Sequence, residues 1–162
     1  MKYNKWILLV MMLVPWLSLP MLGKRNFKRY LPGAFFIIVW ISVESIVAKR
    51  RAWWRFYEKL IPNVMGELPL LFGPFFIGSI WILKFTFGKF FRYLLVNLVM
   101  DVLFSYPGMY VLKRMGIASL VRLKHYQMAI LFMAKSVLMY VVQMIAEKVR
   151  KKPKSLIKRL LP

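Results

Sequence analysis

The run QMAILFMAKSVLMYVVQMIA, residues 127–146, contains one charged side chain, Lys135, in 20 residues. A helix needs about 20 mostly apolar residues to cross the hydrocarbon core of a bilayer, so this run has the length and composition of one crossing. Four similar runs precede it and are predicted to be helices as well, over residues 6–22, 34–48, 68–87 and 90–112. The pattern predicts an all-α fold, a polytopic membrane bundle of about five transmembrane helices.

The composition leaves little room for anything besides this bundle. Apolar residues make up 60% of the 162-residue chain, against about 45–50% in a soluble domain. Five crossings of about 20 residues use roughly 100 positions, and only short connections remain. We therefore expect a single bundle over residues 1–147, followed by a basic tail over 148–162.

The positive charge of the chain lies at the ends of the apolar runs. The formal net charge is +21, but Lys and Arg stand in short clusters and form no continuous basic face. Such clusters favour contact with anionic lipid head groups, and we expect no nucleic-acid binding. One cluster follows the second predicted helix and is predicted to contact head groups; it consists of Lys49, Arg50, Arg51 and Arg55.

Proline and glycine interrupt three of the predicted helices. Pro15 lies in the first, Gly73 and Pro74 in the third, and Pro107 with Gly108 in the fourth. We expect bends at these points and not helix ends, because neighbouring side chains can satisfy backbone groups that a break sets free. No small-residue cleavage pattern follows the first run, so we expect it to be a retained helix.

The connecting segments are predicted to lie at the membrane surface. Residues 23–33 resemble a basic loop closed by a Pro-Gly turn, residues 53–59 alternate aromatic and charged side chains, and residues 113–126 suit an amphipathic surface helix. With five crossings, 11 basic residues lie on the side of the N-terminus and 14 on the other. The positive-inside rule then favours a cytoplasmic C-terminus.

Few residue types that support catalysis are present. Cysteine is absent and His125 is the only histidine, whereas catalytic zinc normally has three protein ligands. We therefore expect His125 to be an interfacial polar residue, and we predict no metal site. Neither a nucleophile with its base nor a glycine-rich phosphate loop is recognisable, so we predict no catalytic residue, no cofactor and no enzymatic activity.

The acidic residues are the clearest functional clue, because there are only five. An ionisable group at membrane depth costs a few kcal/mol and is by default a candidate for function. Asp101 and Lys135 lie about 16 and 12 Å from the loop that joins their helices, near the middle of a core about 30 Å thick. We therefore predict a buried ion pair between Asp101 and Lys135.

Polar residues follow helical spacing around this predicted pair. Asn97, Asp101 and Ser105 occur at i, i+4 and i+8 and share one face of the fourth helix. The arrangement suits a proton or ion relay, or a pair that binds a substrate. It also suits a structural ion pair that fixes the register of the helices, which is the preferred interpretation.

Glu44 and Glu67 are expected near one rim of the bundle. Glu44 lies about one turn from the end of the second predicted helix, and Glu67 lies at the start of the third. Together with Lys49 and Arg50 they would form either a solvated edge or a polar cluster for lipid head groups. Two carboxylates could also perform acid and base chemistry, which leaves a lipid-modifying enzyme as a third possibility.

A long part of the chain resembles a known group of proteins. Its residues are ELPLLFGPFF at 67–76, KFTFGK at 84–89 and NLVMD at 97–101. They look like those of small multi-spanning proteins of bacilli and related Firmicutes, and the resemblance covers most of the chain. It implies a helical bundle in a bacterial plasma membrane, but neither an activity nor a site.

These observations favour a non-catalytic membrane subunit or interaction module in a bacterial cytoplasmic membrane. Its expected partners are anionic lipids and either another protein or further copies of the same chain. The alternative is a small ion-coupled transporter that uses Asp101 and Lys135.

Overall fold

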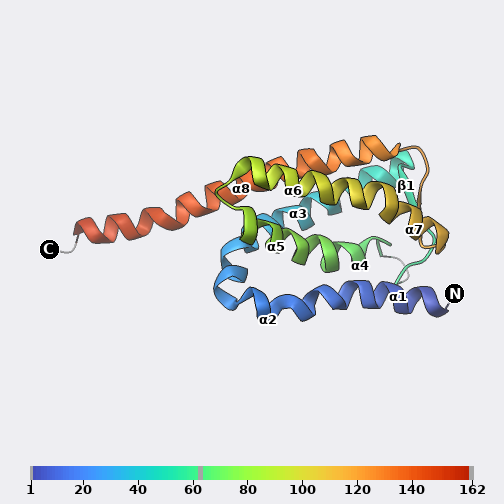
Figure 1. Ribbon diagram of the computed structural model, residues 1–162, viewed down its shortest axis with the longest axis horizontal. Coiled ribbons are helices and arrows are strands. Elements are labelled where there is room, and N and C mark those ends of the chain that lie inside the picture. The colour runs from blue at the N-terminus through green and yellow to red at the C-terminus, as the bar shows by residue number, and fades with distance from the viewer. Residues whose placement is uncertain (1, 62–63, 161–162) are drawn as a thin grey trace.

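The computed structural model describes residues 2–61 and 64–160. Within them, five helical spans are long and apolar enough to cross a membrane: Asn4–Leu22, Lys24–Arg51, Leu68–Thr86, Phe90–Arg114 and His125–Lys151. They form an up-and-down bundle with the termini at opposite ends (Figure 1). The predicted all-α bundle of five transmembrane helices is therefore confirmed. Residues 1, 161 and 162, which the predicted bundle and tail included, lie outside the described residues.

The first span contains the expected bend at Pro15. It consists of α1 (Lys2–Leu13), a 3₁₀ turn (Val14–Ser18) that contains Pro15, and α2 (Leu19–Leu22). Its backbone packs directly on Gly73 of the third span, where a Cβ would overlap the carbonyl oxygen of Met11 and the Cα of Met12. The third span therefore needs glycine at this position.

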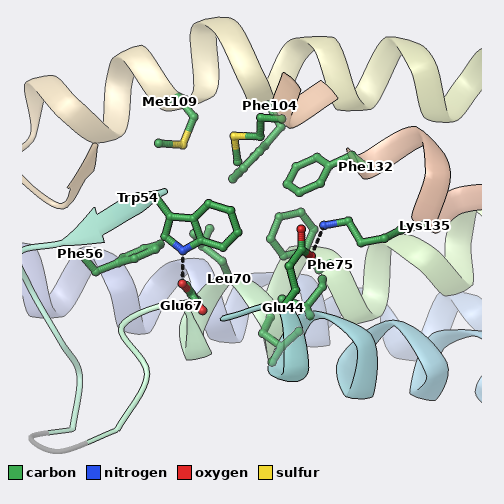
Figure 2. Close-up of a pocket in the computed structure, with 13 residues that line it drawn as sticks. Glu44, Trp54, Phe56, Glu67, Leu70, Phe75, Phe104, Met109, Phe132 and Lys135 are labelled. Carbon is green, nitrogen blue, oxygen red and sulfur yellow. Dashed lines mark hydrogen bonds and ion pairs between the residues drawn. The ribbon is translucent and has the colours of Figure 1, made fainter. Parts of the chain in front are cut away.

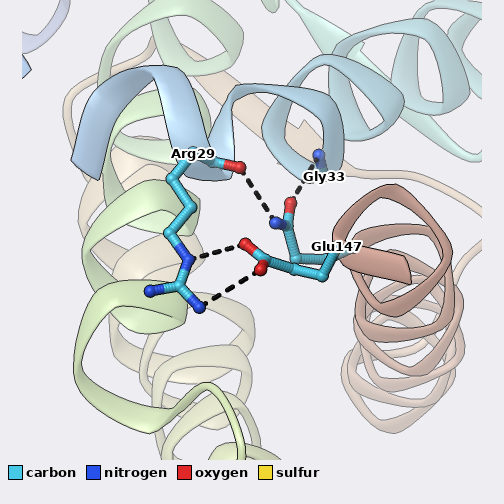
Figure 3. Close-up of polar contacts among 4 residues, drawn as sticks. Arg29, Gly33 and Glu147 are labelled. Carbon is cyan, nitrogen blue, oxygen red and sulfur yellow. Dashed lines mark hydrogen bonds and ion pairs between the residues drawn. The ribbon is translucent and has the colours of Figure 1, made fainter. Parts of the chain in front are cut away.

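The second span, α3 (Lys24–Arg51), begins ten residues earlier than predicted. Residues 23–33 are not a loop, because the helix continues through Pro32. The Gly33 N–H donates to Gln143 Oε1 (3.2 Å), and Gln143 Nε2 donates to the carbonyl oxygen of Arg29 (2.9 Å). The side chain of Gln143, from the last helix, thus bonds to the backbone groups beside the proline. Figure 3 shows this junction, where Arg29 also pairs with Glu147 at 2.6 Å.

The third and fourth spans bend at their prolines through π-helical turns. The third comprises α4 (Leu68–Leu70), the π turn Leu71–Phe75 and α5 (Phe76–Thr86). The fourth comprises α6 (Phe90–Leu103), the π turn Phe104–Gly108 and α7 (Met109–Arg114). A π turn accommodates one extra residue within a helix and often occurs at a functional site.

Side chains from other spans bond to the backbone of both π turns. The indole Nε1 of Trp16 donates to the carbonyl oxygen of Phe72 at 2.8 Å, and Nδ1 of His125 donates to the carbonyl oxygen of Ser105. A side chain from another span thus bonds to the backbone within each of these two bends.

Two segments predicted to lie separately on the membrane surface form one β-ribbon. Strand β1 (Trp54–Phe56) pairs antiparallel with β2 (Ala118–Leu120), so that Arg55 faces Ser119. The surface helix predicted over residues 113–126 is therefore wrong. Aromatic and branched side chains such as those of 53–57 suit a strand when a partner is available, and the bundle supplies that partner at the end where the N-terminus lies (Figure 1).

The last span belongs to α8 (His125–Leu160), a helix of 36 residues. It begins two residues before the predicted start at residue 127 and continues through most of the segment that was predicted as a tail. Its length of about 54 Å exceeds a hydrocarbon core of about 30 Å. Figure 1 shows it leaving the bundle at the end opposite the N-terminus.

The buried residues form two hydrophobic clusters, one toward each end of the bundle. The first includes Ile37, Ile80 and Met139, and the second includes Leu70 and Met109. Phe75, in the first π turn, packs against both clusters. The candidate site lies where the two clusters meet.

Candidate intramembrane cation site

A buried ion pair between α8 and α3 forms the centre of the site. Nζ of Lys135 lies 2.6 Å from Oε2 of Glu44, and their side chains are only 5% and 8% exposed. The same ammonium lies 4.0 Å from the centroid of the Phe132 ring, in cation–π geometry. Figure 2 shows both residues pointing into the bundle from opposite sides.

The predicted pair between Asp101 and Lys135 is wrong, because Lys135 pairs with Glu44. Asp101 is half-buried, and its Oδ2 is buried without a hydrogen-bond partner among the described residues. Counting residues from the loop that joins the two helices predicted correctly that both side chains lie near one another. It could not give the rotation of each helix about its axis, which decides the direct contact.

The solvated edge expected for Glu44 is also wrong. Because α3 continues to Arg51, Glu44 lies seven residues, or about 10 Å, from the end of the helix. A signal for this burial was present in the sequence: Glu44 follows Ile37 and Ile41 at helical spacing, on the face of α3 that packs into the bundle.

Glu67 connects the β-ribbon to the bundle. Its carboxylate accepts hydrogen bonds from the Ser45 hydroxyl on α3 and from the Trp54 indole N–H on β1. Glu67 precedes α4, and Ser45 is the neighbour of Glu44 in the chain. These two bonds attach the ribbon to α3 next to the residue that pairs with Lys135, and Figure 2 shows Trp54 on one side of the site and Lys135 on the other.

Two cavities lie on either side of three phenylalanines. Ring centroids of Phe75, Phe104 and Phe132 are 5.0 to 5.6 Å apart. A cavity of about 40 Å³ reaches Glu44, Glu67 and Trp54. A second, of about 140 Å³, reaches Asp101 and Asn97. The three phenylalanines and Lys135 line both cavities.

The polar stripe predicted on the fourth span faces the bundle. Asn97 and Ser105 are buried. The Ser136 hydroxyl donates to Oδ1 of Asn97 (3.1 Å), and the Tyr93 hydroxyl donates to the carbonyl oxygen of Ser136 (2.7 Å). Oγ of Ser105 is buried and has no partner among the described residues.

The basic cluster at the end of α3 lies outside this site. All four of its side chains are exposed, at the end of the bundle that carries the β-ribbon; they are Lys49, Arg50, Arg51 and Arg55. This position is compatible with lipid head groups, and the contact stays a prediction.

The charges of the interior do not balance. Glu44, Glu67 and Asp101 surround one ammonium, that of Lys135. A buried charge without a partner costs several kcal/mol. Glu44 is paired with Lys135 and Glu67 accepts two hydrogen bonds, so Asp101 is the carboxyl without a direct partner among the described residues. All four residues were candidates from the sequence, where Asp101 and Lys135 were predicted to pair near the midplane and Glu44 and Glu67 to lie at a solvated rim. The structure brings them to one site.

The fold and this site define a multi-pass membrane protein with a charged cluster inside its helical bundle. Comparisons with protein-family models, with curated proteins and with solved structures find no match for the chain.

Proposed function

We propose that this chain is a small ion-coupled carrier of a bacterial cytoplasmic membrane, in which Asp101 takes up and releases a proton. The observation that carries the proposal is the position of the Asp101 carboxyl. Its Oδ2 is buried and has no hydrogen-bond partner in the part of the chain that the structure describes. It lies beside a cavity of about 140 Å³, while Lys135 is paired with Glu44. The resemblance to proteins of bacilli supports the bacterial membrane, and the excess of basic residues supports a cytoplasmic C-terminus.

The chemistry of an isolated carboxyl supports a role in proton exchange. In an apolar core the neutral acid is the less costly form of such a carboxyl, because no hydrogen bond or ion pair to Asp101 is present among the described residues. A cavity of this size has room for several waters. When water reaches Asp101 from one face of the membrane, the carboxyl can ionise, and when the water leaves it must be neutral again. Its protonation therefore depends on which face the cavity contacts.

The test is a comparison of the wild-type chain with Asp101→Asn in proteoliposomes that contain a pH-sensitive dye. We expect the wild type to collapse an imposed pH gradient and Asp101→Asn to lose most of this flux. Infrared difference spectra across a pH titration should contain a carboxyl band that Asp101→Asn lacks. Glu58→Gln, the same chemical change outside the site, serves as the matched control.

The opposite outcome would favour the non-catalytic subunit. If Asp101→Asn leaves both the flux and the titrating band unchanged while the protein stays folded, the carrier proposal is wrong. The ion pair would then serve only to fix the register of the helices.

A further inference from the structure

We infer that an anionic phospholipid binds in a groove at the end of the bundle that carries the β-ribbon, with its phosphate beside Lys113. The groove lies between α7, β2 and the first residue of α8, and its volume is about 310 Å³. It is called the rim groove below, and its lining consists of Tyr106, Met109, Tyr110, Lys113, Leu120 and His125. The inference goes beyond the proposed function, because it does not depend on proton exchange at Asp101.

The rim groove begins at the level of the head groups and runs toward the middle of the membrane. Lys113 is the next-to-last residue of the fourth span, and His125 is the first residue of the fifth. Tyr106, Met109 and Tyr110 precede the lysine by seven, four and three residues, so they share its face of the helix. At a rise of about 1.5 Å per residue, Tyr106 lies roughly 10 Å deeper than Lys113. The groove is thus charged at the surface and aromatic below, in the order in which a phospholipid presents its phosphate and its chains.

The charge at the surface end of the groove is positive and is not neutralised there. The Lys113 side chain is exposed and forms no ion pair among the described residues. None of the lining residues is acidic. An ammonium group at this level attracts anionic lipids and repels the choline group of a zwitterionic lipid. The hydroxyls of Tyr106 and Tyr110 can in addition donate hydrogen bonds to phosphate or glycerol oxygens.

One wall of the groove is held in place by contacts within the protein. The rings of His125 and Tyr106 stack, with centroids 5.3 Å apart and planes at 25°. Nδ1 of the same histidine donates to the carbonyl oxygen of Ser105. Met109 is buried in the second hydrophobic cluster and closes the groove toward the bundle. Side chains that are already fixed lose less conformational entropy when a ligand binds.

The volume of the groove suits a head group together with the first part of its chains. A space of about 310 Å³ corresponds to roughly 20 to 30 water-sized groups at 10–15 Å³ each, which is far more than a phosphate ion fills. A soluble anion would contact one lysine and leave the tyrosine rings and Leu120 uncovered. The glycerol and first methylene groups of a lipid would cover these apolar surfaces, which is favourable. The lining therefore favours a phospholipid over free phosphate.

The experiment is native mass spectrometry of the full-length protein in mild detergent, titrated with dioleoyl-phosphatidylglycerol or with dioleoyl-phosphatidylcholine. We expect saturable binding of phosphatidylglycerol and clearly weaker binding of phosphatidylcholine. Lys113→Gln should weaken the binding of phosphatidylglycerol by about tenfold, as expected for loss of a charge-assisted contact. Arg114→Gln is the matched control, because it removes the same charge from the same rim but lies outside the lining. It should weaken binding much less.

A second pair of variants tests whether the lipid occupies the groove itself. Leu120→Trp places a larger side chain in the groove without changing any charge, and it should also weaken the binding of phosphatidylglycerol. Val121→Trp makes a comparable change at the next residue, outside the lining, and should leave binding unchanged. Leu120 is half-exposed and Val121 is exposed, so both positions have room for the larger side chain at the surface.

Three results would overturn the inference. Equal losses of binding in Lys113→Gln and Arg114→Gln would show a general attraction between the basic rim and anionic lipid, without a site. Equal binding of phosphatidylcholine by the wild type would show that charge does not select the ligand. Displacement of the lipid by glycerol 3-phosphate at a similar concentration would show that the groove binds a soluble phosphate group.

Discussion

The side-chain amide of Gln143 replaces the backbone hydrogen bond that Pro32 disturbs in α3. A proline inside a helix removes one N–H and displaces the preceding turn. The Gly33 N–H and the Arg29 carbonyl are the two groups that pair with each other in a regular helix at this position. Gln143 accepts from the first group at 3.2 Å and donates to the second at 2.9 Å. A side-chain amide can donate and accept at the same time, through two separate atoms.

Substitution of Gln143 should be costly only while Pro32 is present. Gln143→Leu leaves two buried backbone groups without partners, and we expect the free energy of unfolding to fall by about 1–3 kcal/mol. With Pro32→Ala, the helix can form its own bonds, so the same substitution should cost clearly less. A denaturant titration of the four proteins in mixed micelles measures the difference. Equal losses in both backgrounds would contradict the bridging role.

Single and double substitutions of the ion pair between Lys135 and Glu44 should differ in their effect on the free energy of unfolding. Lys135→Met leaves a buried carboxylate unpaired, and we expect a loss of about 3–5 kcal/mol in unfolding free energy. Adding Glu44→Gln removes that charge and should recover much of the loss. Thermal unfolding in detergent measures both effects.

A matched control for the ion-pair experiment removes a carboxylate elsewhere in the chain. Glu58→Gln removes one carboxylate from a half-exposed position and should change stability by less than about 0.5 kcal/mol. If Asp101→Asn rescues Lys135→Met and Glu44→Gln does not, the pairing of Lys135 with Glu44 is contradicted.

Gly73 and Gly78 should differ sharply in their tolerance of alanine. A Cβ at Gly73 meets the backbone of α1, whereas a Cβ at Gly78 meets nothing within 4 Å. We expect Gly73→Ala to destabilise the bundle by about 1–3 kcal/mol through overpacking, and Gly78→Ala to be neutral or slightly stabilising. Limited proteolysis of the first span gives a direct measure of its detachment. Equal susceptibility of both variants would contradict the close packing.

Ala52 offers a site for stabilisation. It ends α3 with φ 51° and ψ 46°, the left-handed conformation, which is unfavourable for a residue with a Cβ and favourable for glycine. Ala52→Gly should therefore raise the free energy of unfolding by up to about 1 kcal/mol. As a control, Ala146→Gly, within α8, should lower it by a similar amount. A decrease for both variants would show that the backbone at position 52 is not strained.

Local composition was sufficient for the helices but not for the contacts between them. The bounds of the third and fourth spans were predicted to within two residues, because their apolar runs end in clear charged or glycine signals. The start of α3 was missed because a proline such as Pro32 usually ends a helix. Gln143, whose side chain bonds to the backbone beside this proline, lies more than 100 positions away in the chain. For the same reason, the prediction missed the β-ribbon and paired Lys135 with Asp101 instead of Glu44. Both depend on how distant elements are rotated and paired.

Lys135 and the far end of α8 belong to a single unbroken helix. The 16 residues from Lys135 to Lys151 rise about 24 Å along this helix, so a tilt of about 5° at the ion pair moves Lys151 by roughly 2 Å. Any change in the angle of α8 at Lys135 therefore also moves the basic residues toward the far end of the same helix.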